Sequence, residues 1–101
     1  MKFRYLSGAW RDYEEALMWH QRQATGLGAE LAQEIDAAIE RIRPDPTSWE
    51  AIEPNCHRVP VRRFRYSVIF QVRPNLPEIL IVAVMHASRD PDYWKSRIRD
   101  E

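Results

Sequence analysis

The sequence predicts an α+β fold: an N-terminal strand, an antiparallel helical hairpin packed on an antiparallel sheet of about four strands, and a short C-terminal helix. Two observations favour this fold. Between residues 9 and 43 the apolar residues recur at helical spacing, with one short glycine-containing break, whereas after residue 55 they alternate as in strands. Helices followed by a run of strands are typical of one helical layer covering an antiparallel sheet. The length of 101 residues corresponds to one domain, spanning residues 1–101.

A short strand and two helices are expected in the first part of the chain. Lys2–Leu6 alternates polar and apolar residues, and Ser7 follows as a candidate N-cap. The helical pattern covers residues 9–23 and ends at the segment 25–28, which contains two glycines. A second helix is predicted over residues 27–43, where two nearby prolines end it. Helices joined by so short a turn form an antiparallel hairpin.

Three strands are expected in the second part. Residues 44–55 contain three prolines and predict an irregular loop. Residues 58–62 alternate around a proline, which favours an edge strand or the start of a strand. Tyr66–Val72 alternates as a strand with one dominant apolar face, and two prolines in residues 73–77 predict a turn. Ile79–Met85 is apolar on both faces, which indicates a central strand or one whose second face awaits a partner.

The C-terminal stretch predicts a short final helix. Asp90 is the expected N-cap, and Pro91 occupies the first helical position, which proline favours. Tyr93 and Trp94 follow in this helix.

Charge is distributed unevenly along the chain. Residues 1–54 carry six basic and ten acidic side chains, whereas residues 55–101 carry nine basic and five acidic ones. This asymmetry predicts a molecule with one basic face. We therefore expect an anionic partner for that face, either nucleic acid or an acidic protein segment.

Several classes of site are disfavoured by the composition. Cys56 is the only cysteine, which excludes an intrachain disulfide and a cysteine-built metal site. No glycine-rich phosphate loop, paired metal ligands or nucleophile–histidine–acid arrangement is visible, so we expect no metal and no cofactor. The N-terminus lacks an apolar signal region, and no stretch approaches the ~18 apolar residues of a membrane span. We expect a cytoplasmic protein without a membrane partner.

Two C-terminal segments carry a family resemblance. Residues 62–70 are Arg-Arg-Phe-Arg-Tyr-Ser-Val-Ile-Phe, and residues 82–91 are Val-Ala-Val-Met-His-Ala-Ser-Arg-Asp-Pro, followed by Trp94 and Arg97. These segments and the order of elements resemble the RelE/ParE family of toxins from type II toxin–antitoxin modules over nearly the whole chain. Arg65 departs from the pattern, since many relatives carry proline there. The resemblance implies a cognate antitoxin and a toxin–antitoxin hetero-oligomer.

The family divides by target, so the resemblance implies three possible functions. ParE-like members inhibit DNA gyrase by binding and are not enzymes, whereas RelE-like members are ribosome-dependent endoribonucleases that cut messenger RNA. The ending His-x-x-Arg-x-Pro-x-x-Trp, residues 86–94, resembles the ParE-like, plasmid stabilisation branch more closely. A gyrase inhibitor is therefore the first expectation and an endoribonuclease the alternative. A decayed toxin that keeps the fold and binds its antitoxin is the third.

A nuclease would need a base for the 2′-OH proton, cations for the charge on the phosphorane and an acid for the leaving oxygen. His86 is the only plausible imidazole near the basic strand ends, and Tyr66 offers a proton or a stacking ring. The candidate cations are Arg62, Arg63, Arg65 and Arg89. Alternatively, His86 only ends a strand and hydrogen-bonds the chain that follows. His20 is expected in the core or at its rim, and His57 is assigned no role.

A second group of residues is expected to bind the target or the antitoxin. These candidates are Arg58, Arg65, Tyr66, Trp94 and Arg97. Arginines between residues 58 and 65 suit a nucleic acid or an acidic antitoxin segment, or they only discourage aggregation of an edge strand. Trp94 either caps the second face of the sheet or contributes to a partner surface. The same two possibilities remain open for the other three tryptophans.

Overall fold

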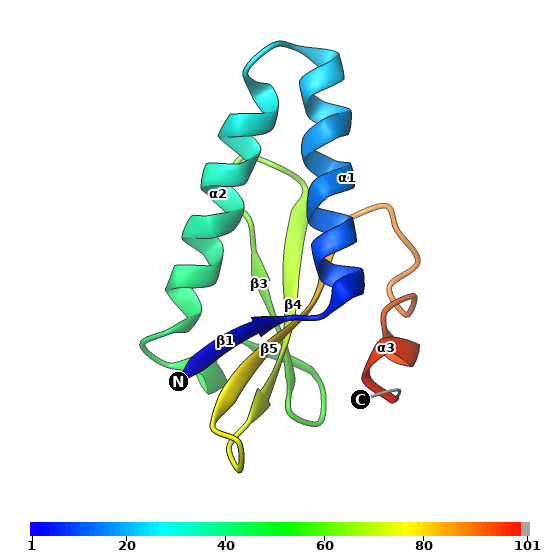
Figure 1. Cartoon of the computed structure of the whole chain (residues 1–101). Coiled ribbons are helices and arrows are strands. Elements are labelled where there is room, and N and C mark those ends of the chain that lie inside the picture. Colours follow the sequence, from blue (N-terminus) through cyan, green and yellow to red (C-terminus); the bar gives the residue numbers. More distant parts are fainter. Residues whose placement is uncertain (100–101) are drawn as a thin grey trace.

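The computed structural model describes residues 1–99 and shows an α+β fold (Figure 1). In chain order the elements are β1 (Lys2–Tyr5), α1 (Ser7–Gln23), α2 (Leu27–Ile42), a 3₁₀ turn (Pro46–Ser48), β2 (Glu50–Glu53), β3 (Cys56–Pro60), β4 (Tyr66–Arg73), β5 (Glu78–His86) and α3 (Lys95–Arg99). The predicted N-terminal strand, helical hairpin and C-terminal run of strands are confirmed.

The sheet has five strands rather than about four, in the order β1-β5-β4-β3-β2. The additional strand is β2, which lies in residues 44–55, where we predicted only a loop. β2 is only four residues long and lies in a proline-rich segment, so its alternation of polar and apolar residues is too short to be recognised. It forms a strand because it pairs with β3. β1 is parallel to β5, whereas the other neighbours are antiparallel, so the sheet is mixed.

The prediction that residues 58–62 form an edge strand or the start of a strand is wrong in bounds and position. β3 begins at Cys56 and ends at Pro60, and it lies between β2 and β4. The N–H of Val61 still bonds the carbonyl of Tyr66, and β2 pairs with β3 only as far as Arg58, so the N–H that Pro60 lacks faces no strand. Arg62 and Arg63 lie in the following turn, where Arg63 has a φ of 69°. Their positions do not follow the alternation of a strand.

Two glycines shape the helical hairpin. Gly26, with a φ of 90°, allows the turn between α1 and α2. A Cβ on Gly28 would lie 2.8 Å from the carbonyl oxygen of Leu17, so this glycine allows the helices to approach closely. Gln21 of α1 accepts hydrogen bonds from the backbone N–H groups of both glycines. Ser7 is the first residue of α1 rather than its N-cap, which is Leu6.

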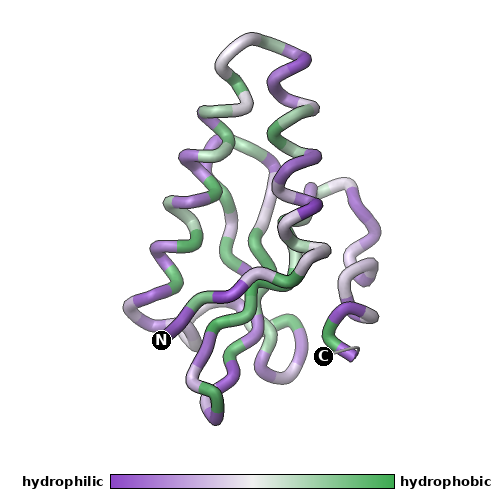
Figure 2. The backbone as a smooth tube through the Cα atoms, viewed as in Figure 1, coloured by the Kyte–Doolittle hydropathy of each residue, from purple (hydrophilic) through white to green (hydrophobic). Residues whose placement is uncertain are grey.

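The core lies on both faces of the sheet, and β5 is an interior strand between β1 and β4. Glu78 to Met85 are buried, as the apolar pattern predicted, and most of this segment is green in Figure 2. The helical hairpin covers one face. On the other face Trp94 is only 1% exposed and lines a cavity together with Cys56 and Gln71, which are paired across β3 and β4.

The final helix starts later than expected. α3 begins at Lys95, whereas residues 91–94 form turns. The Asp90 carboxylate accepts a hydrogen bond from the N–H of Asp92, so it stabilises a turn and is not the N-cap of the helix. The predicted helix exists, but its predicted start is wrong.

Candidate functional site

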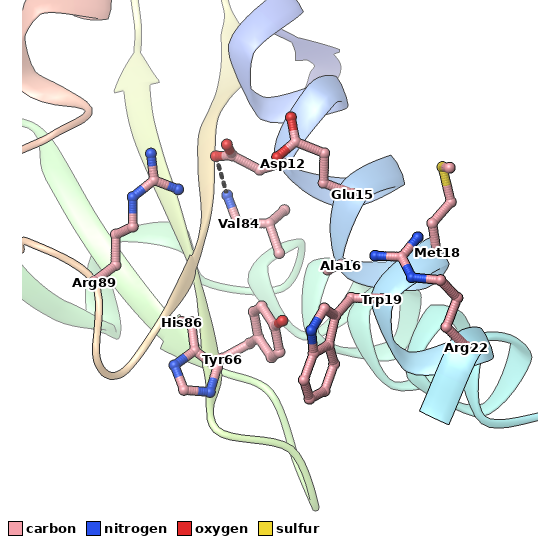
Figure 3. A pocket seen from close by; sticks show the side chains of 10 residues that line it. All are labelled: Asp12, Glu15, Ala16, Met18, Trp19, Arg22, Tyr66, Val84, His86 and Arg89. Atoms are coloured by element: carbon pink, nitrogen blue, oxygen red, sulfur yellow. Dashed lines mark hydrogen bonds between the residues drawn. The ribbon is translucent and has the colours of Figure 1, made fainter. Parts of the chain in front are cut away.

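Two pockets lie beside the paired ends of β4 and β5. The first, of about 330 Å³, lies between α1 and the sheet (Figure 3). Asp12, Glu15, Trp19 and Arg22 come from α1, while Tyr66, Val84, His86 and Arg89 come from the sheet and the segment after it. This pocket therefore combines aromatic rings with charges of both signs.

The second pocket, of about 400 Å³, opens toward the other face of the sheet. Pro60, Ser67 and Met85, which line it, occupy successive paired positions on β3, β4 and β5, so they share that face. Its charged lining residues are Arg58, Arg65 and Arg89, and none of its lining residues is acidic. Tyr66 and Arg89 line both pockets, so the two pockets meet there.

The four candidate catalytic residues are not brought together. His86 and Arg89 line the first pocket. Arg63 instead turns to α2, where its guanidinium lies 2.9 Å from a carboxylate oxygen of Glu30 and 4.0 Å from one of Glu34. Arg62 lies in the same turn, near Arg41. The pKa of Arg41 is lowered mainly by burial and also by the positive charge of Arg62.

The imidazole of His86 is held by the chain that follows it. Its Nδ1 accepts a hydrogen bond from the backbone N–H of Ser88 at 3.0 Å and lies 2.8 Å from the Ser88 hydroxyl. Because a backbone N–H can only donate, Nδ1 is an acceptor, and the neutral ring carries its hydrogen on Nε2. The free nitrogen of the neutral ring is therefore a donor and not a base.

The aromatic ring of Tyr66 contacts the rings of two histidines. Its ring centroid lies 4.9 Å from that of His86 and 5.6 Å from that of His20. Burial raises the pKa of its hydroxyl. His20 was expected in the core or at its rim, and it lies at the rim, half-buried with its ring against Phe64 and Tyr66. His57 is buried, stacks on Phe70 and bonds the carbonyl of Trp49.

Three of the five candidate binding residues share the second pocket. Arg58, Arg65 and Tyr66 line it, although Arg58 also pairs with Glu50 at 2.6 Å. Trp94 and Arg97 lie elsewhere, since Trp94 is buried and Arg97 pairs with Asp12. The other tryptophans differ among themselves: Trp49 is half-buried, whereas Trp10 and Trp19 are about half exposed.

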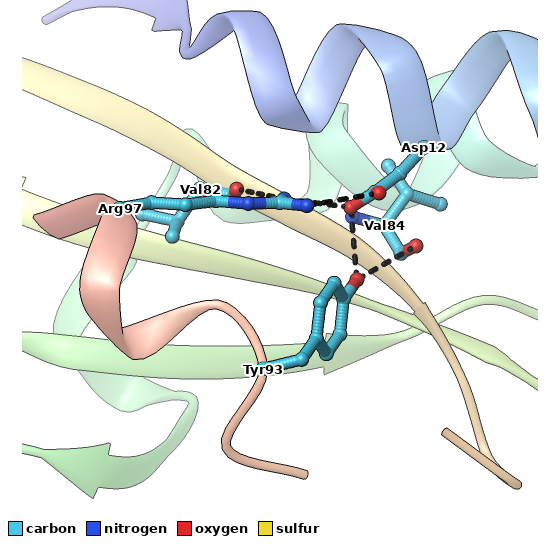
Figure 4. A network of polar contacts seen from close by, with 5 residues as sticks. All are labelled: Asp12, Val82, Val84, Tyr93 and Arg97. Carbon is cyan, nitrogen blue, oxygen red and sulfur yellow. Dashed lines mark hydrogen bonds and ion pairs between the residues drawn. The ribbon is translucent and has the colours of Figure 1, made fainter. Parts of the chain in front are cut away.

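A buried polar network at the edge of β5 was not predicted from the sequence (Figure 4). Asp12 Oδ2 accepts hydrogen bonds from the N–H of Val84 at 3.1 Å, the hydroxyl of Tyr93 at 2.8 Å and Arg97 at 2.8 Å. Arg97 also donates to Asp12 Oδ1 and to the carbonyl of Val82. No sequence pattern links these groups, because Asp12 and Arg97 are 85 residues apart.

This network replaces a missing strand. β1 ends at Tyr5, which pairs with Ile81, so beyond that point β5 has no neighbouring strand on this side. Side chains of Asp12, Tyr93 and Arg97 hydrogen-bond the exposed backbone groups of β5 instead. Burial and the Asp12 carboxylate raise the pKa of Tyr93 well above its ordinary value, so the hydroxyl remains a donor.

Comparison with known proteins assigns the family. The model of the ParE toxin of the type II toxin–antitoxin system parDE matches residues 4–91. The chain belongs to the ParE toxin family. A cognate antitoxin is therefore implied as the partner of this ParE-family toxin. No curated relative matches it.

Solved structures show the same fold. The ParE-family chain is similar to a chain of the chromosomal ParDE toxin–antitoxin system from P. aeruginosa, with a TM-score of 0.68 and 18% identity, covering 85% of this chain and 95% of that one. It is also similar to the isolated E. coli RelE toxin, with a TM-score of 0.57 and 15% identity, covering 99% of this chain and 98% of that one.

Two further findings concern the described part of this ParE-family toxin. Within residues 1–99, no three His, Cys, Asp or Glu side chains gather closely enough to hold a metal ion. No helix in the same range combines the length and apolar character needed to cross a membrane.

Proposed function

We propose that this ParE-family toxin acts in the cytoplasm by binding and inhibiting DNA gyrase, and that its cognate antitoxin neutralises it in a hetero-oligomeric complex. The observation that carries the proposal is the dispersal of the candidate nuclease groups. Arg63 pairs with Glu30 on α2, whereas His86 lies beside β4 in the first pocket. General acid–base catalysis needs its groups within hydrogen-bond reach of one substrate.

The first pocket is also a poor place for the charge of a cleaved phosphodiester. Asp12 and Glu15 line it together with His86 and Arg89. Carboxylates oppose the approach of a phosphate and the negative charge that develops in the transition state. In neutral His86 the basic nitrogen, Nδ1, already accepts a hydrogen bond from the N–H of Ser88, so the nitrogen left free is Nε2, which carries the hydrogen. These features favour binding over cleavage.

The second pocket supports the antitoxin part of the proposal. Its three arginines and the apolar side chains of Val61, Phe64 and Met85 suit a segment that carries both acidic and apolar residues. We assign Arg58, Arg65 and Tyr66 to this contact. Trp94 and Arg97 would act there only indirectly, by fixing the C-terminal segment to the sheet.

Induction of the chain in a bacterial host tests the proposal. Growth, bulk translation, messenger integrity and plasmid supercoiling are followed together. We expect growth arrest with loss of supercoiling while messages stay intact, and purified toxin should inhibit gyrase on relaxed plasmid. Early translation arrest with cleaved messages would replace the proposal with the RelE-like endoribonuclease. Unaffected growth at confirmed expression would identify a decayed toxin.

A single substitution separates binding from proton chemistry. His86→Ala should leave toxicity within about twofold of wild type, because the imidazole performs no proton transfer in a gyrase inhibitor. Wild-type and variant dose–response curves are compared at equal expression, with circular dichroism as the fold control. A nontoxic, folded His86→Ala protein would contradict the binding mechanism.

A further inference from the structure

Arg89 stands at the junction of the two pockets. It is exposed and, within residues 1–99, forms no ion pair. Its guanidinium carbon lies 3.9 Å from the centroid of the Tyr93 ring. A guanidinium over an aromatic face is held by a cation–π contact while its N–H groups remain available to a carboxylate.

The ring beneath Arg89 is itself fixed at two further points. The Tyr93 hydroxyl donates to Asp12 Oδ2 at 2.8 Å and lies 3.4 Å from the carbonyl oxygen of Val84. The guanidinium carbon of Arg97 lies 4.9 Å from the ring centroid, and Arg97 also pairs with Asp12. The Asp12 side chain is only 8% exposed. The position of Arg89 is therefore set by α1 and β5, and not only by the turn that carries it.

The charges of the two pockets distinguish a peptide from a nucleic acid. Phosphates in a nucleic acid follow one another at every nucleotide, so a strand crossing both pockets would bring one against Glu15, which has no cationic partner in the described part of the chain. A peptide carries carboxylates only at chosen positions. It can place one carboxylate at Arg89, a different one at Arg65 and a neutral residue beside Glu15.

We propose that Tyr93 and Asp12 are positioning residues that hold Arg89 as the anchor for a carboxylate of an acidic peptide segment bound across the two pockets. The proposal rests on the proposed function in one respect, namely that the partner is a protein. Tyr93 lines neither pocket and acts through Arg89, and Asp12, which is largely buried at the edge of the first pocket, acts by holding Tyr93. The loss of Tyr93 then weakens binding by the amount that Arg89 contributes.

A double-mutant cycle tests this role. The probe is a fluorescein-labelled synthetic peptide of alternating leucine and glutamate, and its affinity for the full chain is measured by fluorescence anisotropy. We expect Arg89→Gln and Tyr93→Leu each to weaken binding about tenfold, as loss of a charge-assisted contact does. The double variant should bind no more weakly than either single variant. Tyr93→Phe, which keeps the ring but loses the hydroxyl, should have a smaller effect that Asp12→Asn reproduces.

Arg65 provides the matched control, because it lines the second pocket and, within residues 1–99, the cation–π contacts of Tyr93 are with Arg89 and Arg97. Arg65→Gln and Tyr93→Leu should weaken binding independently, so their effects multiply. A structural role for Tyr93 alone would give the same multiplication with Arg89→Gln, which would overturn the proposal. If Tyr93→Leu loses its circular dichroism signal, the cycle is run with Tyr93→Phe.

Two further results would overturn the proposal: no measurable binding of the acidic peptide, or binding of a single-stranded RNA of equal length with the same dependence on Arg89. Neither depends on supercoiling in cells. Intact gyrase inhibition with a failed cycle rejects only the role of Tyr93 and Asp12, whereas a successful cycle without gyrase inhibition rejects only the proposed target.

Discussion

Glu78 is a buried carboxylate that joins three strands. It lies at the start of β5, pairs in register with Lys2 of β1 and Arg73 of β4, and is only 8% exposed. Its oxygens accept hydrogen bonds from Arg4 at 3.3 and 3.2 Å and from Arg73 at 3.4 Å. Hydrogen bonding to Arg4 is the main cause that lowers its pKa below the ordinary value, and Arg73 acts in the same direction.

Glu78→Gln should reduce the dependence of stability on acidic pH. Because the folded pKa is depressed, the ionised carboxylate stabilises the fold above its ordinary pKa of about 4.3, and this contribution is lost as pH falls through the folded value. Urea unfolding from pH 7 to pH 3 should show wild type more stable at neutral pH and converging on the variant at the acid end. Glu14→Gln, on the exposed face of α1, should leave the pH profile unchanged. Parallel curves for wild type and Glu78→Gln would reject this role.

At the scale of elements, two glycines allow close approach: Gly28 between the two helices, and Gly8 between α1 and the C-terminal segment. Gly28 faces a backbone carbonyl of α1, which cannot move without separating the helices. Gly8 faces the side chain of Arg97, with a Cβ built there 2.6 Å from Arg97 Nε. The first contact is rigid, whereas the second involves a side chain that can shift at the expense of its bonds to Asp12.

Gly28→Ala should destabilise the protein more than Gly8→Ala. Alanine gains about 1 kcal/mol of helix propensity at either position, but overpacking against a rigid neighbour costs about 1–3 kcal/mol. We expect the free energy of unfolding to fall for Gly28→Ala and to change less for Gly8→Ala, as measured by urea unfolding. A Gly28→Ala protein as stable as wild type would show that the helices separate freely.

Elements with a strong local pattern could be predicted from the sequence. The apolar repeat of α2 and the two-sided apolar run of β5 each identify an element without reference to the rest of the chain. β2 was missed because only pairing with β3 makes it a strand, and the parallel alignment of β1 with β5 joins opposite ends of the sequence. The residues of the candidate site likewise divide into those with a local sequence signal and those that depend on distant partners. Residues 58 to 66 were recognised from their local charge, but Asp12 was not, because its partners are distant.

At the scale of the whole molecule, the C-terminal segment belongs to the core. Trp94 is among the most buried side chains and packs on the sheet face opposite the hairpin. Lys95 adds a 2.6 Å ion pair to Glu53 of β2, while Arg97 and Tyr93 bond the edge of β5. One short segment therefore packs on one face of the sheet, pairs with the edge strand β2 and bonds the part of β5 that β1 leaves unpaired.

Trp94→Ala should destabilise the fold by about 3–5 kcal/mol, the usual cost of removing a large aromatic side chain from a core. Trp19→Ala is the matched control. Because Trp19 is 51% exposed, this variant should lose far less free energy of unfolding. Both are measured by urea unfolding with far-ultraviolet circular dichroism as the signal. Equal losses for the two variants would mean that the C-terminal segment does not contribute to the core.

The pairing of β1 with β5 has a consequence for how this toxin is made. Lys2 and Glu78 are partners in the sheet, so β1, the first strand to leave the ribosome, cannot pair until β5, the last strand, has been synthesised. About 75 residues separate them, and at about 5–20 residues per second this interval lasts roughly 4–15 seconds. During that time the nascent chain lacks β5 and the residues after it, so neither pocket is complete. Translation that stops before residue 78 therefore releases a fragment that cannot complete the sheet, and the complete fold depends on synthesis reaching the final strand.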